Sequence, residues 1–146
     1  MNRYLFYIAY LLNFSFPQEL SNGLMLYTPY NGPDSSQITT YLTDENLNII
    51  NSWNHEYAPA SMAYLMKDST LWYPSRVPIT TMDSGGVGGR IQHLDWDNNI
   101  LWDFSLSNDS LQHHHDIEIL PNGNILILAW EKKKPRRGVN DGKRSY

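Results

Sequence analysis

Hydrophobic and polar residues alternate in short runs along most of the chain, and clusters of Asn, Asp, Gly and Pro separate these runs. Alternation with a period of two is typical of β-strands that bury one face, and the clusters are typical of turns. The sequence shows little of the three-to-four-residue periodicity of helices. We therefore expect an all-β protein in which successive strands pair in antiparallel fashion.

The alternating runs recur after about fifty residues. DENLNIINSW (44–53) aligns without a gap with DWDNNILWDF (95–104), at an offset of 51 residues. LMKDSTLWY (65–73) aligns with ILPNGNILI (119–127) at an offset of 54. Each unit reads as strand, Asx-rich turn, strand, loop, strand, turn, strand. We therefore expect two four-stranded meanders, over about residues 24–78 and 88–130.

A four-stranded repeat of this length, with a large aromatic residue near the end of its second strand, is typical of a β-propeller blade. A closed propeller holds roughly 4–8 blades, and a single blade buries its faces only against neighbours. Residues 22–131 are therefore expected to form about two propeller-like blades of an incomplete ring. Such a chain either associates with other chains or is a fragment, and the sequence leaves its oligomeric state open.

The composition suits one β-rich domain and limits the partners. The chain has 146 residues, 13% of them aromatic, and a net charge of −4. Seven basic residues and one acidic residue lie in residues 132–146, a net +6, whereas residues 1–131 carry a net −10. The acidic body carries no nucleic-acid footprint. The chain contains no cysteine, which excludes disulfides and thiolate metal sites.

The two ends differ from the repeats. Residues 1–21 resemble a signal peptide, with Arg3 before the apolar run Tyr4–Leu12, which is too short to span a bilayer. We therefore expect a secreted or periplasmic protein without a membrane span, and a buried first strand is the alternative for this run. Residues 132–146 are expected to be irregular, either as a genuine basic tail or as the product of a shifted reading frame.

A run of histidines, QHHHD (112–116), precedes the last alternating segments. These side chains could face a ligand, bind zinc or copper, or form a polar loop before a strand. Because successive strand residues alternate between faces, only His113 and His115 are expected to point the same way. A three-histidine metal site from this run is therefore disfavoured.

Three segments resemble the arylsulfate sulfotransferase family, in particular its secreted bacterial members. They are GLMLYTPYNGPDSSQITTYLTDENLNIINSW with its continuation to STLW, GGVGGRIQHLDWDNNILWDFS, and QHHHDIEILPNGNILILAWEKK, and they cover about residues 22–133. The most specific part is His114-His115-Asp116 followed by Leu120-Pro121-Asn122-Gly123-Asn124. The resemblance implies a six-bladed β-propeller whose central channel holds the active site. It also implies sulfuryl transfer from a phenolic sulfate ester to a phenol acceptor through a sulfohistidine, without a cofactor.

The resemblance implies roles for three residues: His114 and His115 would be catalytic and bind sulfate oxygens, and Asp116 would orient an imidazole. Arg90, at the end of the glycine-rich stretch, is a further candidate for binding the substrate anion. The segment expected to carry the nucleophilic histidine lies in later blades, and the family pattern here stops near Lys133. We therefore expect an N-terminal fragment that is inactive by itself. The alternative is a secreted propeller that binds ligands without catalysis.

The remaining candidates have structural interpretations. The glycine-rich stretch from Ser84 to Arg90 lacks the Lys and helix of a phosphate loop, so a flexible connector is favoured. His55 and His93 are expected to be structural or solvated. Aromatic residues on the strands are expected to pack between blades rather than to stack on a phenolic substrate, namely Trp53, Trp72, Trp96, Trp102 and Phe104.

Overall fold

The computed structural model describes residues 23–30, 32, 37–78, 80, 82 and 85–133. The signal peptide expected in residues 1–21 and the tail from residue 134 onward lie outside this range. Within it the chain forms strands and no helix, which confirms the all-β prediction. The strands are β1 (Met25–Tyr27), β2 (Ile38–Thr43), β3 (Ile49–His55), β4 (Tyr64–Leu65), β5 (Leu71–Arg76), β6 (Gly89–Leu94), β7 (Ile100–Ser105), β8 (Leu111–Ile119) and β9 (Ile125–Glu131).

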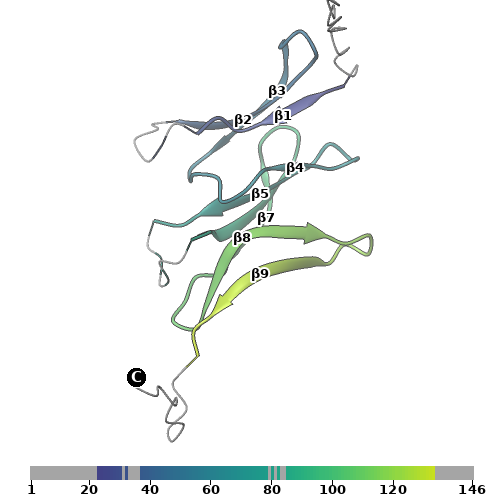
Figure 1. Cartoon of the computed structure of the whole chain (residues 1–146). Coiled ribbons are helices and arrows are strands. Elements are labelled where there is room, and N and C mark those ends of the chain that lie inside the picture. Colours follow the sequence, from purple (N-terminus) through teal and green to yellow (C-terminus); the bar gives the residue numbers. More distant parts are fainter. Residues whose placement is uncertain are drawn as a thin grey trace, which may run out of the picture.

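The nine strands form three antiparallel sheets. Their strand orders are β1-β2-β3, β4-β5-β6-β7 and β8-β9, so hydrogen-bonded neighbours are always consecutive in sequence. Figure 1 shows the sheets lying face to face in chain order, with the four-stranded sheet between the other two. Each of the outer sheets therefore has one face toward the central sheet.

The predicted boundaries of the two meanders are wrong, because β4 and β5 pair with β6 and β7 rather than with β2 and β3. The break between sheets falls between β3 and β4. The connection there, residues 56–63, is shorter than the connection between the paired strands β5 and β6. Loop length therefore does not show which connection crosses from one sheet to the next.

The predicted repeat is confirmed at its four hairpin turns, residues 44–48, 66–70, 95–99 and 120–124. In each turn the N–H of the first residue donates to the carbonyl oxygen of the fifth, and the carbonyl oxygen of the first accepts from the N–H of the fourth. In the first turn both N···O distances are 3.1 Å. The fourth residue always has a positive φ: Leu47 (64°), Ser69 (66°), Asn98 (67°) and Gly123 (83°). This pattern fits the three-residue hairpin loop in which a left-handed residue forms a bulge.

The strand registers reveal a third occurrence of the unit. β1 pairs with β2 as Met25↔Thr43 and Leu26↔Leu42. β5 pairs with β6 as Leu71↔Leu94 and Trp72↔His93. The offset of 51 residues carries the β2 positions onto the β6 positions, so β1 occupies the place of β5. The first sheet (β1-β2-β3) thus holds the last three strands of a four-stranded unit, and the central sheet (β4-β5-β6-β7) holds all four. The third sheet (β8-β9) holds the first two strands.

Two apolar clusters hold the stack together. Leu42, Trp53, Leu71, Tyr73 and Leu94 pack between the first two sheets, and Trp72, Ile91 and Ile117 pack between the last two. Successive residues of β5 alternate between these clusters, so this strand is buried on both faces. Burial of a large apolar side chain contributes about 1.5–3 kcal/mol. The clusters are therefore the main source of sheet-to-sheet adhesion.

The prediction that the aromatic residues pack between sheets is confirmed for Trp53 and Trp72, which are buried. Trp96 is partly exposed, but its ring contacts Trp53 edge-on at 5.6 Å. Trp102 and Phe104 on β7 remain 38% and 37% exposed, because no further hairpin covers their face among the described residues. Within the described part of the chain, no helix has the length and apolar character needed to cross a membrane.

Candidate histidine site

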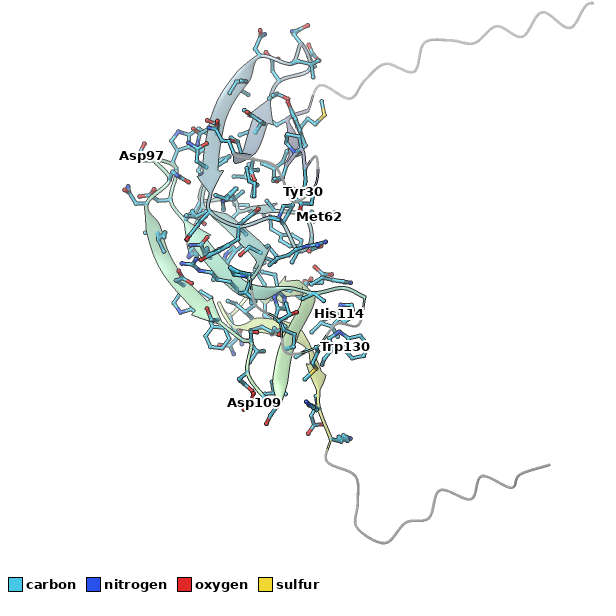
Figure 2. All side chains as sticks on the ribbon, turned by 90° about the vertical axis from the view of Figure 1, so that its left-hand side faces the viewer. Tyr30, Met62, Asp97, Asp109, His114 and Trp130 are labelled. Carbon is cyan, nitrogen blue, oxygen red and sulfur yellow. The ribbon has the colours of Figure 1, made fainter. Side chains whose placement is uncertain are left out.

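The histidines lie at one edge of the stack. β4 and β8 are the first strands of their sheets, and the Tyr64 hydroxyl on β4 donates a hydrogen bond to Asp116 Oδ1 on β8. The opposite edge carries β3 and β7. In Figure 2, His114 and Trp130 lie together on the same side of the molecule as Met62, and Asp97 lies on the other side.

An irregularity in β8 brings two histidines together. The pairing with β9 shifts register between His113 and Ile117. The rings of His114 and His115 meet edge-to-face, with centroids 4.2 Å apart. The expectation that only His113 and His115 can point the same way is therefore wrong, because strict alternation holds only in a regular strand and a bulge re-aims the side chains.

The glycine-rich loop lies against these histidines. A Cβ atom on Gly86 would be 2.1 Å from His114 Cε1 and 2.8 Å from His115 Cδ2. A Cβ atom on Gly88 would be 2.3 Å from His113 Nδ1. The flexible-connector interpretation misses this role, since these two glycines allow the backbone to approach the imidazoles more closely than any other residue type.

His113 is fully buried and serves the fold. Its Nδ1 accepts a 3.1 Å hydrogen bond from the Gly89 N–H, so the ring proton is on Nε2, which lies 3.3 Å from the Asp116 carbonyl oxygen. Burial lowers the pKa of His113, and the nearby His115 and His114 lower it further. The ring is therefore neutral at pH 7 and fixed as one tautomer.

His114 and His115 are partly exposed and have no such partners. The Nδ1 atoms of both rings are buried without a hydrogen-bond partner. Desolvation lowers the pKa of His114, and the adjacent His115 acts in the same direction. The indole ring of Trp130, on β9, lies 4.8 Å from the His114 ring. An imidazole beside an aromatic ring can donate to an anion or act as a nucleophile.

The Asp116 carboxylate does not hold an imidazole, contrary to the role the resemblance implies. It accepts from the Tyr64 hydroxyl and from the Ile117 N–H at 3.0 Å, and only its backbone carbonyl contacts His113. The hydrogen bond from Tyr64 lowers the pKa of Asp116. The pKa of Tyr64 is raised to about 12, mainly by burial and further by the hydrogen bond to Asp116.

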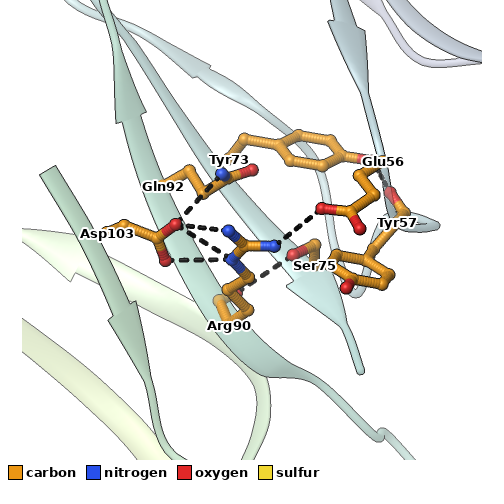
Figure 3. A network of polar contacts seen from close by, with 7 residues as sticks. All are labelled: Glu56, Tyr57, Tyr73, Ser75, Arg90, Gln92 and Asp103. Atoms are coloured by element: carbon orange, nitrogen blue, oxygen red, sulfur yellow. Dashed lines mark hydrogen bonds and ion pairs between the residues drawn. The ribbon is translucent and has the colours of Figure 1, made fainter. Parts of the chain in front are cut away.

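Arg90 is held by carboxylates. Its guanidinium donates to both oxygens of Asp103, at 2.9 and 3.1 Å from Nε, and to Glu56 at 3.2 Å, and it lies over the Tyr57 ring (Figure 3). The bond to Asp103 raises the Arg90 pKa further. An anion would have to displace one of these partners, so Arg90 is poorly placed to bind a substrate anion.

His55 and His93, the two histidines outside the run, have structural roles. The His55 ring stacks on Tyr73 with centroids 3.5 Å apart and contacts Thr40 Oγ1 at 2.8 Å through Nε2. Desolvation lowers the pKa of His55 to about 3. The His93 ring stacks on Trp72 at 4.1 Å, and desolvation lowers its pKa also.

Tyr64 and Trp130 belong to the site although nothing in the sequence marks them. Tyr64 becomes recognisable only once β4 and β8 are known to be edge strands of adjacent sheets. Trp130 reads as an ordinary strand residue, since only the β8 register shift places an imidazole beside it. Among the described residues, no group of three or more His, Asp or Glu side chains is arranged to hold a metal ion.

Comparisons with models of protein families, with curated proteins and with solved structures gave no match to this chain.

Proposed function

We propose that the chain supplies N-terminal blades of an exported β-propeller of the arylsulfate sulfotransferase type, in which His114 and His115 bind the sulfate group of a phenolic sulfate ester. The stacked antiparallel sheets with a fifty-residue repeat support the propeller assignment. The observation that carries the ligand assignment is the side-by-side placement of the two rings by the β8 register shift.

The chemistry around the rings supports binding of an anionic aryl ester. A neutral imidazole can present one N–H to a sulfate oxygen, and two adjacent rings can present two. Trp130 beside His114 offers an aromatic face for the phenol.

Within the described part of the chain, Arg90 does not offer a free positive charge to stabilise the transferring sulfuryl group, because it is paired with Asp103 and Glu56. The resemblance places the nucleophilic histidine in later blades. We therefore propose that the 146-residue chain binds aryl sulfates but transfers little or no sulfuryl group. Adding the downstream blades should restore turnover.

A non-catalytic binding module is the second candidate. The Asp116 carboxylate lies next to the histidine run, and Arg90 is already paired with Asp103. Both features favour a ligand with little charge over a sulfate ester. Such a module would bind the free phenol at least as tightly as its sulfate ester.

Binding and turnover of nitrophenyl sulfate separate these outcomes. Titration of the purified chain should shift the imidazole NMR signals of His114 and His115, and nitrophenol release with phenol as acceptor should be near background. His114→Ala and His115→Ala should each weaken binding about tenfold, the loss of one hydrogen bond to a charged group. Asp97→Ala, on the opposite side of the molecule, is the control. Equal binding of nitrophenol and its sulfate would reject a sulfate site.

A further inference from the structure

An apolar groove lies beside the free edge of β9. It has a volume of about 850 Å³ and runs between the central sheet and the β8-β9 hairpin. Its wall includes Trp72, His93, Trp102, Phe104, Ile125 and Ile127. β9 pairs only with β8 in the described structure, so its other edge presents free backbone groups next to this groove. An exposed edge of this kind is a template for another strand.

The interface between the first two sheets shows what fills such a groove. There the β6-β7 hairpin continues from β5, and its turn caps the preceding sheet. Trp53 Nε1 donates to the Asp95 carbonyl at 2.8 Å, and Asn51 Nδ2 donates to the Trp96 carbonyl at 2.8 Å.

The β7 positions equivalent to Asn51 and Trp53 are Trp102 and Phe104, which are exposed and lack a covering turn among the described residues. The groove therefore lies where a hairpin equivalent to β6-β7 would pack against the β8-β9 sheet.

Among the described strands, β2-β3 is the other hairpin that holds the third and fourth strands of the repeat, as β6-β7 does. Its neighbour β1 has only three residues, and Met25 and Tyr27 of β1 are 44% and 39% exposed. β9 has seven residues and occupies the same place in the repeat as β1 and β5. In the β1 register, Ile125 would face Thr43 and Ile127 would face Tyr41. The ladder would then continue to Ala129 opposite Thr39, beyond the reach of β1.

We propose that β9 of one molecule replaces β1 of a second copy of this chain, so that the second copy's β2-β3 hairpin fills the groove. The Asp44–Asn48 turn then covers Trp102 and Phe104, as the Asp95–Asn99 turn covers Asn51 and Trp53. Each copy contributes strands to two complete four-stranded sheets. The contact joins two different surfaces, so copies associate head to tail and close into a ring when the rotation allows. This inference rests on the sheet registers and not on the proposed ligand.

Cross-linking tests the register directly, because the chain contains no cysteine. Ala129→Cys and Thr39→Cys are made as separate proteins, mixed and oxidised. Directly opposed residues of an antiparallel pair lie about 4.5–5.5 Å apart at Cα, which a disulfide can bridge. The expected product is a linked pair that forms only in the mixture. Ala129→Cys mixed with Asp97→Cys is the control and should remain largely unlinked.

Light scattering of the unmodified chain provides an independent measurement, in case the cysteine variants fold poorly. We expect a mass that rises with concentration toward a small multiple of the monomer. Phe104→Lys should reduce both this association and the cross-link by at least tenfold, whereas Asp97→Lys should reduce neither. A monomer at all concentrations would overturn the proposal. Rapid self-linking of Ala129→Cys alone would overturn it too, since that result means β9 pairs with β9.

Discussion

Leu47 has a backbone conformation that its side chain disfavours. It is the fourth residue of the first hairpin turn, with a φ of 64°, and its side chain is 63% exposed. The equivalent position in the last turn is Gly123. Left-handed backbone costs a residue with a Cβ atom about 1 kcal/mol. Of the four equivalent turn positions, only the one in the last turn therefore holds the glycine that this conformation favours most.

Replacing these residues should change stability in opposite directions. Leu47→Gly is expected to raise the free energy of unfolding by about 0.5–1 kcal/mol, because it removes the left-handed penalty and loses little packing. Gly123→Ala is expected to lower it by about 1 kcal/mol. Urea unfolding monitored by tryptophan fluorescence measures both. A destabilised Leu47→Gly protein would show that this exposed leucine makes contacts that outweigh its backbone strain.

The partly buried His55 ring makes stability depend on pH. Its pKa in the folded chain is about 3, below the 6.5 of the free side chain, so the folded state disfavours the proton. The associated stability is present above pH 6.5 and is lost as the pH falls toward 3. We expect the free energy of unfolding to be on the order of 2–3 kcal/mol lower at pH 4.5 than at pH 7.

His55→Gln isolates this contribution, because the amide can keep a bond to Thr40 without titrating. The variant should lose most of the difference between pH 7 and pH 4.5 in urea titrations. His93 and His113 also have lowered pKa values and should account for the remainder. An unchanged pH dependence in His55→Gln would assign the effect to those two rings.

The glycine-rich loop packs directly against the histidines of β8. Gly86→Ala and Gly88→Ala each force a Cβ atom into an imidazole, and Gly86 also has a φ of 77°. Overpacking of this kind costs about 1–3 kcal/mol.

We expect both variants to be destabilised by that amount and Gly86→Ala to move the NMR signals of His114 and His115. Gly85→Ala is the matched control, since a Cβ atom there meets nothing within 4 Å. Equal effects at all three glycines would instead indicate a general loss of loop flexibility.

Most individual strands and turns could be predicted from the sequence, because alternation and Asx-Gly turns are local signals. The repeat that aligned Asp44 with Asp95 corresponds to two turns with the same hydrogen bonds. The division into sheets could not be predicted in this way, because connections within and between sheets carry similar residues. The pairing of His114 with His115 was also out of reach, since the β8 register shift breaks the alternation from which side-chain directions are inferred.

At the scale of the whole molecule, Arg90 joins the first two sheets. It belongs to β6 but reaches Glu56, which follows β3, as well as Asp103 on β7. The Glu56 side chain is 66% exposed and that of Asp103 is 31% exposed. Solvent screening leaves an exposed ion pair worth little, whereas a bidentate, partly buried pair contributes more.

Asp103→Asn should therefore lower the free energy of unfolding by about 1 kcal/mol, and Glu56→Gln by less than about 0.5 kcal/mol. Added salt should reduce the effect of Glu56→Gln more than that of Asp103→Asn. Thermal unfolding at low and high ionic strength measures both values. Equal losses would mean that the link between the sheets matters as much as the link within the central sheet.

The burial of β5 on both faces has a consequence for how the molecule opens. The inner strand β5 can expose its amides only after one of two apolar clusters separates, whereas β1 and β9 can detach from the edges of their sheets. Amide hydrogens should therefore exchange with solvent in an order set by position in the stack. Those of β1 exchange first, those of β9 next, and those of β5 and β6 last. Proteases that need an extended, detached segment would cut in the same order, so the central sheet should survive as the resistant core.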